Sequence, residues 1–160
     1  MDKIFRDNGG LTELINKLKK EKKIIVFTNG VFDIIHRGHV EYLNQAKKLG
    51  DVLIVGINSD SSVKKIKGED RPIIGESDRA FVLVNLKAVD FVVIFQEDNP
   101  YNLIKNILPD VLVKGGDWKE KNIIGSEIVL NSGGKVISLN YVDNYSTSSI
   151  IDTVQKKSET

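Results

Sequence analysis

The stretch IIVFTNGVFDIIHRGHVEYL, residues 24–43, decides the fold of this chain. It opens with a continuous, β-branched apolar run, Ile24–Thr28, which is typical of a parallel strand buried on both faces. A turn at Asn29–Gly30 follows, and a helix is expected to begin close to Arg37 or Gly38. A strand that enters a helix through a short glycine-bearing loop predicts the first unit of an open α/β sheet.

The same alternation of strand and helix continues along the chain. Four further apolar runs predict strands, at Val52–Ile57, Phe91–Phe95, Val111–Val113 and Val136–Leu139. Helical patterns flank and separate them, at Leu11–Leu18, Val40–Leu49, Glu76–Leu86, Asn99–Leu108 and Ser146–Val154. The sequence therefore predicts an α/β fold, a Rossmann-like open parallel five-stranded sheet with helices on both faces. We expect one domain over residues 1–160, with an N-terminal helix within residues 1–21 and a polar tail at residues 155–160.

The composition excludes several classes of function. The 160 residues include 23 basic and 22 acidic side chains, so a net charge of +1 gives no overall field that favours nucleic acid or an acidic membrane. The absence of cysteine excludes disulfides and thiolate metal sites. No apolar run approaches the roughly 18 residues of a membrane helix, and the first residues contain no stretch of signal-peptide length. We therefore expect a soluble cytoplasmic protein.

The loop after the first strand has the features of an anion-binding site. Gly30 lies where the backbone turns sharply, and Gly38 lies where a side chain would obstruct close approach. His36 comes just before the helix and His39 in its first turn, where free backbone amides bind anions. Two imidazoles there suit the negative charge that builds up on a phosphate during a displacement. Neither GxxxxGK[ST] nor GxGxxG occurs, which excludes a kinase-type phosphate loop and the dinucleotide fingerprint.

Two alternatives stay open for this loop. His36 and His39 have the spacing of half a zinc site, although no third ligand lies at a familiar distance in the sequence. Asp33 is either a turn residue that orients the loop or a carboxylate that helps to hold Mg²⁺.

The pattern GxFDxxHxGH at residues 30–39 resembles the signature of the cytidylyltransferase-like nucleotidyltransferases. Four later segments resemble a narrower group, the adenylyltransferases of ADP-heptose synthesis: NSDSSVKKIKGEDRP (58–72), SDRAFVLVNLKAVDFVV (77–93), LPDVLVKGGDWKEKNIIGSEIV (108–129) and YSTSSII (145–151). The resemblance covers residues 22–153. Ser148 replaces the last threonine of the relatives' S-T-T and keeps the hydroxyl. Some relatives place a cation soon afterwards, where this chain has Ser149 and Ile150.

The resemblance implies a nucleotidyltransferase of the HxGH type that transfers AMP from ATP to D-glycero-β-D-manno-heptose 1-phosphate. The products would be ADP-heptose, which serves polymers such as lipopolysaccharide, and pyrophosphate. Mg²⁺ would accompany ATP, held mostly by phosphate oxygens and water. Many relatives fuse this activity to a sugar kinase, and here we expect it to follow a separate heptose kinase. Relatives are often oligomers, so we expect a homo-oligomer, with a dimer as the first choice.

The resemblance also implies roles for individual residues. Catalytic roles fall to His36, His39, Lys67 and Thr147. Nucleotide contacts are expected from Thr28, Asn29, Gly30, Phe32, Asp33, Gly38, His39, Lys114, Gly116, Asp117, Ser146, Thr147 and Ser148. The acceptor sugar phosphate would be bound by Asn58, Asp60, Lys64, Lys67, Arg71 and Arg79.

Simpler structural roles compete with several of these assignments. Ser146 is a good helix N-cap. The lysines at 64, 65 and 67 form a solvated cluster in an expected loop, and Lys67, beside Gly68, is the first choice for a phosphate contact. Arg79 has Glu76 and Asp78 as possible partners within its own helix.

Two other functions fit the same sequence. The first is a cytidylyl- or adenylyltransferase acting on another small acceptor, such as glycerol 3-phosphate. The second is a regulatory module that binds nucleotide without catalysis. Nucleic-acid binding is disfavoured by the near-zero net charge and the few aromatic residues.

Overall fold

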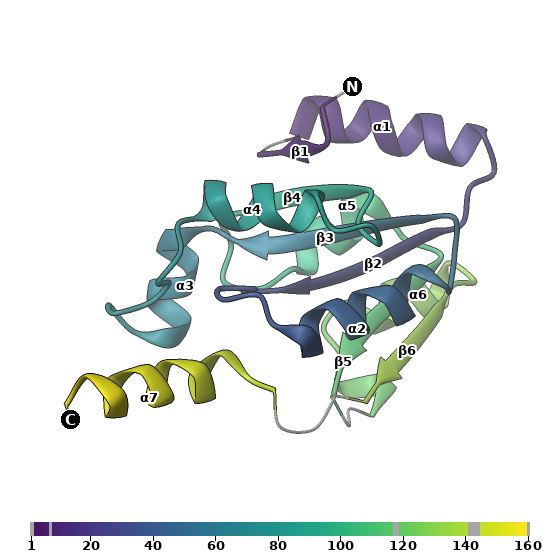
Figure 1. Ribbon diagram of the computed structural model, residues 1–160. Coiled ribbons are helices and arrows are strands. Elements are labelled where there is room, and N and C mark those ends of the chain that lie inside the picture. Colours follow the sequence, from purple (N-terminus) through teal and green to yellow (C-terminus); the bar gives the residue numbers. More distant parts are fainter. Residues whose placement is uncertain (1, 7, 117–118, 141–144, 160) are drawn as a thin grey trace.

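The computed structural model describes residues 2–6, 8–116, 119–140 and 145–159, and its centre is a six-stranded parallel sheet (Figure 1). The strand order is β1-β4-β3-β2-β5-β6. The strands are β1 (Ile4–Phe5), β2 (Ile25–Gly30), β3 (Val52–Asn58), β4 (Phe91–Phe95), β5 (Val111–Gly115) and β6 (Lys135–Leu139). β3 is buried along its whole length, as expected of a central strand covered on both faces.

Helices cover both faces of this sheet. They are α1 (Asn8–Lys20), α2 (Arg37–Lys47), α3 (Asp60–Lys67), α4 (Glu76–Val84), α5 (Tyr101–Ile107), α6 (Ser126–Asn131) and α7 (Thr147–Ser158), with a short 3₁₀ helix, η1 (Glu120–Asn122). One core cluster joins the sheet to α1, α5 and α6, and a second joins it to α2 and α4. Figure 1 shows α2 and α4 on the near face and α5 and α6 behind the sheet. No helix in the described ranges is long and apolar enough to cross a membrane.

The strand order reverses at β2, which fixes where a ligand is expected to bind. The chain runs from β2 outward to β3 and β4, and then crosses to β5 on the other side of β2. Thr28 pairs with Val55 of β3 on one side and with Val113 of β5 on the other. The loops that leave β2 and β5 therefore diverge at the carboxyl edge of the sheet, the position where open α/β sheets bind their ligands.

The α/β class, the parallel sheet and the five expected strands are confirmed, and the sixth strand was not expected. β1 contains only Ile4 and Phe5, which pair with Val92 and Val93 of β4. Two residues carry no periodicity, so the sequence pattern gave no sign of this strand. The helix that was expected within residues 1–21 lies at Asn8–Lys20.

One other expectation was wrong. Lys64, Lys65 and Lys67 lie on α3 rather than in a loop, because Ser59 caps a short helix by accepting a hydrogen bond from the Ser62 amide. The expected polar tail is helical as far as Ser158, the last residue of α7.

Candidate active site

A cavity of about 530 Å³ opens at the carboxyl edge of β2 and β5, where the strand order reverses. We call it the switch-point cavity. Its walls come from the loop between β2 and α2 (residues 31–36, the first loop), from the start of α2, from the end of α3 and from the residues that begin α7. Segments distant in sequence thus meet at one site.

The two histidines lie against each other in this cavity. The rings of His36 and His39 are stacked with centroids 3.8 Å apart and planes 20° apart. His36 is the N-cap of α2, and its Nδ1 accepts a long hydrogen bond of 3.4 Å from the His39 amide. A ring nitrogen that accepts carries no proton, so neutral His36 has its proton on Nε2.

Both histidines are neutral at pH 7 without a ligand. Burial, together with the nearby His36, lowers the pKa of His39 to about 4. Burial also lowers the pKa of His36. Nδ1 of His39 is buried and has no hydrogen-bond partner among the described residues. A bound anion would raise the pKa of these histidines, because it stabilises a protonated imidazole.

Phe32 and Gly30 give the first loop its shape. Phe32 has a φ of 50°, a left-handed conformation that a residue with a bulky side chain seldom adopts. Its ring lies with its centroid 5.1 Å from that of His39. A Cβ atom at Gly30 would lie 2.9 Å from the Phe32 ring, so the glycine is required for this packing.

Asp33 joins the first loop to the segment between α3 and α4. One carboxylate oxygen accepts hydrogen bonds from Arg71 Nε (2.8 Å) and the Ile73 amide (2.9 Å), and the other accepts from the Ile74 amide (2.8 Å). Burial would raise the pKa of Asp33, but these hydrogen bonds outweigh it and the pKa is lowered. Since both oxygens are bound by the protein, the geometry favours the loop-orienting role over Mg²⁺ binding.

Cationic side chains line the rest of the cavity. Lys67, Arg71 and Lys114 contribute to its walls, and burial lowers the pKa of Lys114. Lys64 and Lys65 instead lie near Glu69 (3.9 Å) and Asp98 (3.5 Å) respectively. Asp33 compensates the charge of Arg71, so the positive charge that remains at the cavity is that of Lys67 and Lys114. This remaining charge suits a polyphosphate.

Arg79 is not available to a substrate, contrary to the expectation. Its guanidinium is fully buried and donates hydrogen bonds of 2.7–2.9 Å to the carbonyls of Val31, Asn58 and Ile74, and to the Asp60 carboxylate. It therefore joins the first loop, the end of β3 and the segment before α4. This role also occupies Asp60, while the buried Asn58 amide donates to the Ser62 hydroxyl.

The hydroxyl run at the start of α7 lines the cavity. Ser146 is the N-cap, and its hydroxyl oxygen accepts a hydrogen bond of 3.0 Å from the Ser149 amide. Thr147 Oγ1 donates to the Ile34 carbonyl at 3.2 Å. Ser148 is exposed. Ser146 and Thr147 thus make hydrogen bonds within the protein. A phosphate at this site would either replace these hydrogen bonds or add to them.

The cavity collects most of the expected site residues. Those at its walls are Asn29, Gly30, Phe32, Asp33, His36, Gly38, His39, Lys67, Arg71, Lys114, Ser146, Thr147 and Ser148. Those outside its walls are Thr28, Asn58, Asp60, Lys64, Arg79 and Gly116. Thr28 is buried and its hydroxyl bonds that of Tyr42 at 2.6 Å. Gly116 donates its amide to Leu139 of β6. Asp117 lies outside the described residues.

Some cavity residues were not assigned from the sequence. Tyr42, Gly115 and Tyr145 all line the cavity. Tyr42 follows His39 by three positions, so the helical repeat places both on one face of α2. Gly115 is the first of two adjacent glycines, and Tyr145 directly precedes the hydroxyl run.

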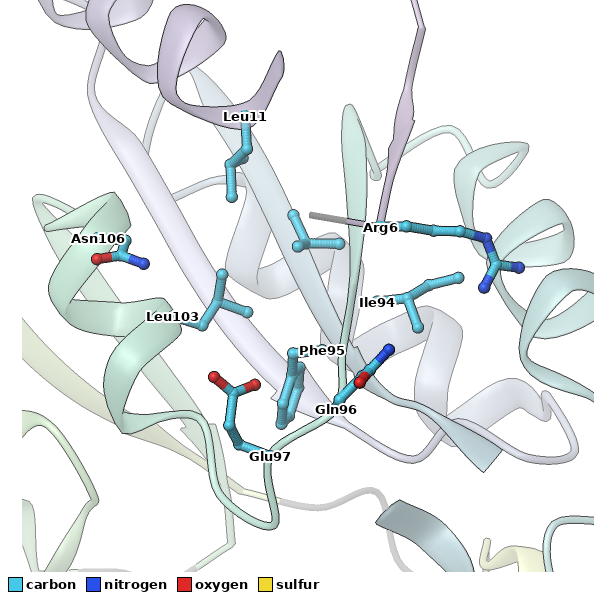
Figure 2. A pocket seen from close by; sticks show the side chains of 9 residues that line it. Arg6, Leu11, Ile94, Phe95, Gln96, Glu97, Leu103 and Asn106 are labelled. Carbon is cyan, nitrogen blue, oxygen red and sulfur yellow. The ribbon is translucent and has the colours of Figure 1, made fainter. Parts of the chain in front are cut away.

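A second cavity, of about 380 Å³, lies beside β4 and between α1 and α5 (Figure 2). Its apolar floor includes Leu11, Phe95 and Leu103, and Figure 2 shows Glu97 and Asn106 near its rim. The Arg6 side chain extends toward α4, where it pairs with Glu76. Neither histidine lines this cavity. Across the described ranges, no group of three or more His, Asp or Glu side chains is arranged to hold a metal ion.

The reversed strand order, the histidines at a helix start and the cationic walls define a nucleotidyltransferase-type α/β protein. The cytidylyltransferase-like family matches residues 27–153. The chain belongs to this family.

The chain is also similar to curated proteins over most of its length. The chain is 56% identical over 144 residues to "Bifunctional protein HldE" of Nitratiruptor sp. and 53% identical over 145 residues to the protein of that name in Campylobacter jejuni subsp. doylei. These matches cover 89% and 91% of this chain, but only 30% and 31% of the relatives. The chain therefore spans a little under a third of the length of these proteins.

Solved structures share the fold. The lipopolysaccharide core biosynthesis protein of Thermoplasma volcanium aligns with a TM-score of 0.60 and 31% identity, over 75% of this chain and 97% of that chain. A pantoate-beta-alanine ligase from Francisella tularensis aligns with a TM-score of 0.62 over 92% of this chain and 74% of that chain. Its 16% identity supports the fold alone.

Proposed function

We propose that this chain transfers AMP from ATP to D-glycero-β-D-manno-heptose 1-phosphate, giving ADP-heptose and pyrophosphate. The observation that carries the proposal is the stacked pair of His36 and His39 at the start of α2, inside a cationic cavity where the strand order reverses. The relatives named HldE and the sequence resemblance to the adenylyltransferases of ADP-heptose synthesis support the choice of acceptor.

The reaction needs positioning and charge stabilisation more than a strong base. A phosphate oxygen of the sugar 1-phosphate attacks the α-phosphorus of ATP in line, and the bond from that phosphorus to the bridging oxygen of pyrophosphate breaks. The nucleophile is already an oxyanion, so no proton has to be removed. The developing charge on the α-phosphate would be stabilised by His36, through Nε2–H, and by His39 and the free amides of α2.

The cavity suggests separate places for the two substrates. The triphosphate would extend from the histidines toward Ser146, Thr147 and Ser148, where helix α7 offers further free amides. The acceptor phosphate would meet Lys67 and Arg71 on the opposite wall. Arg71 is already oriented by Asp33, which reduces the freedom lost on binding.

Mg²⁺ would enter with ATP. In the described part of the cavity Asp33 is the one carboxylate at the wall, and both of its oxygens accept hydrogen bonds from the protein. We therefore propose that the ion is held by phosphate oxygens and water, and that it neutralises phosphate charge.

The proposal also implies a supplier for the acceptor. A kinase that phosphorylates a heptose at its anomeric hydroxyl must act before this step, and the cytoplasm, where ATP is available, is the expected place. A homo-oligomer, with a dimer as first choice, stays a prediction.

The test is a pyrophosphate-release assay with two nucleotides and two acceptors. Wild-type protein is supplied with ATP or CTP, and with the β-anomer of heptose 1-phosphate or with glycerol 3-phosphate. We expect turnover with ATP and the heptose phosphate, and its loss in His39→Ala, because removing a donor aimed at the reacting phosphate costs about 100-fold or more. Faster turnover with CTP would assign another nucleotide to the reaction, and faster turnover with glycerol 3-phosphate would assign another acceptor. No release under any condition, with nucleotide bound, would favour the regulatory alternative.

A further inference from the structure

Tyr145 packs beside His36, the first histidine of the pair. Its ring centroid lies 6.2 Å from that of His36, and the two planes differ by 21°. His39 is stacked on His36, with ring centroids 3.8 Å apart. The His36 ring therefore has two nearly parallel rings as neighbours, both within the distances at which aromatic rings attract one another.

Gly38 makes this packing possible. A Cβ atom at Gly38 would lie 2.9 Å from Cβ of Tyr145 and 3.0 Å from two atoms of the His36 ring. Any larger residue would separate Tyr145 from the start of α2. The glycine between the histidines thus serves a contact within the protein, besides any approach of a ligand.

The placement of Tyr145 depends on the first loop rather than on α7. Helix α7 buries none of its own residues, and Figure 1 shows it extending away from the sheet. Its start is fixed by the Thr147 hydroxyl, which donates to the Ile34 carbonyl, and by Tyr145 against His36 and Gly38. Tyr145 also interacts with Arg37 at the first position of α2.

We propose that Tyr145 is a positioning residue for AMP transfer. Its ring holds His36 in the one orientation in which Nδ1 caps α2 and Nε2–H faces the bound phosphates. The torsion that rotates a histidine ring is soft and roughly two-fold, and a rotated ring would lose both contacts. The inference rests on the proposed function for the donor role of His36, whereas the restraint on the ring is a property of the free protein.

The kinetic test replaces the aromatic ring while leaving the machinery intact. Tyr145→Phe keeps a flat ring and should keep kcat within about twofold of wild type. Tyr145→Leu should lower kcat by about tenfold or more, with a much smaller change in the KM for ATP, because misplacing a contacting group slows the chemical step. Tyr101→Leu is the matched control, since Tyr101 and Tyr145 are both 40% exposed and Tyr101 lies on α5. An unchanged kcat in Tyr145→Leu overturns the proposal.

The second readout is the tautomer of His36, followed by ¹⁵N NMR of the imidazole rings at neutral pH. The chain has two histidines, so His39→Gln assigns both sets of signals. Wild type and Tyr145→Phe should show His36 as the Nε2–H tautomer, and Tyr145→Leu should show both tautomers. An activity loss with an unchanged tautomer would mean a merely structural role and would overturn the proposal.

Two outcomes separate the possible failures. If Tyr145→Leu does not fold, wild type still decides, because mixed tautomers of His36 in the wild-type protein contradict the restraint. If wild type transfers no AMP to a heptose phosphate, the proposed function fails, while the tautomer comparison still tests the restraint without any substrate.

Discussion

At the scale of single residues, the distinctive feature is a pair of stacked, uncharged histidines among cations. Rings 3.8 Å apart cannot both be protonated cheaply, because like charges at that distance repel strongly. Their neutrality avoids this repulsion, and each ring still provides an N–H donor. A polyphosphate then meets donors that need no rearrangement at the moment of reaction.

The lowered pKa of His39 predicts how stability depends on pH. The group titrates near 6.5 when unfolded and at about 4 when folded. The unfolded chain therefore binds more protons between these values, and the free energy of unfolding should fall as pH falls from 6.5 to 4. The difference corresponds to at most about 3 kcal/mol, reduced by the partial exposure of the ring.

Urea unfolding across this range, for wild type and His39→Gln, checks the prediction. The glutamine variant cannot titrate at this position and should show a shallower dependence on pH. Parallel curves for the two proteins would contradict the buried, neutral state of His39.

Arg79 shows how a buried cation can stabilise a site without touching a ligand. Its four hydrogen bonds to Val31, Asn58, Ile74 and Asp60 compensate for the loss of water around the guanidinium. Arg79→Met should lower the free energy of unfolding by about 3–5 kcal/mol, because three carbonyls and a carboxylate lose their partner.

The control for Arg79 is Arg37→Met. Arg37 is exposed and pairs with Glu41 one helical turn away, so denaturant unfolding should give a value close to wild type. Similar losses of unfolding free energy in Arg79→Met and Arg37→Met would mean that burial does not determine how much Arg79 stabilises the protein.

The sequence predicted the histidines but not the role of Arg79. Histidines three positions apart at a helix start can be located from the chain alone, since the spacing itself places them together. Two of the partners of Arg79, the main-chain carbonyls of Val31 and Asn58, belong to segments far away in the sequence. No local pattern encodes those contacts, and the possible partners within its own helix, Glu76 and Asp78, were the only ones that sequence spacing suggested.

At the scale of elements, the first loop and the segment between α3 and α4 behave as one unit. Asp33 accepts hydrogen bonds from Arg71, Ile73 and Ile74, so the wall that carries Arg71 is fixed to the loop that carries His36. The walls proposed to bind the acceptor and the nucleotide are thereby held in a fixed position relative to each other. The lowered pKa of Asp33 means that this contact is complete above its ordinary pKa of 3.8 and is lost as pH falls further.

Asp33→Asn should loosen this unit. The amide cannot accept all three bonds as a carboxylate does, so we expect faster hydrogen exchange at the Ile73 and Ile74 amides and a KM for the acceptor raised by about tenfold. Hydrogen-exchange mass spectrometry and steady-state kinetics measure the two effects.

The control for Asp33 is Asp110→Asn. Asp110 also accepts a hydrogen bond from a backbone amide, that of Ile25 at 2.8 Å, but at the opposite edge of the sheet. This change should leave exchange at Ile73 and Ile74, and the KM for the acceptor, near their wild-type values. Unaltered exchange in Asp33→Asn would refute the coupling.

Prediction of the strands from sequence succeeded where the apolar runs are continuous. The runs that became β2 to β5 are mostly buried, and such runs are typical of parallel strands covered on both faces. Prediction failed for β1, which has two residues, and for α3, whose capping serine lies among residues that also suit a loop. Pairing with β4 and the cap at Ser59 decide these two elements, and neither is visible in periodicity.

At the scale of the whole molecule, a nearly neutral chain concentrates positive charge at one cavity. The net charge is +1, yet Lys67, Arg71 and Lys114 share the walls with two histidines. The field is therefore local, which suits a small polyanion rather than a long nucleic acid. The sheet topology explains the location, since the loops after β2 and β5 diverge only where the strand order reverses.

The most direct measurement is a crystal structure of the protein with a non-hydrolysable ATP analogue. We expect density for the triphosphate in the switch-point cavity, with α-phosphate oxygens within hydrogen-bonding distance of His36 and His39. Density for the nucleotide in the second cavity, beside Phe95 and Leu103, or a triphosphate that leaves both histidines untouched, would contradict it.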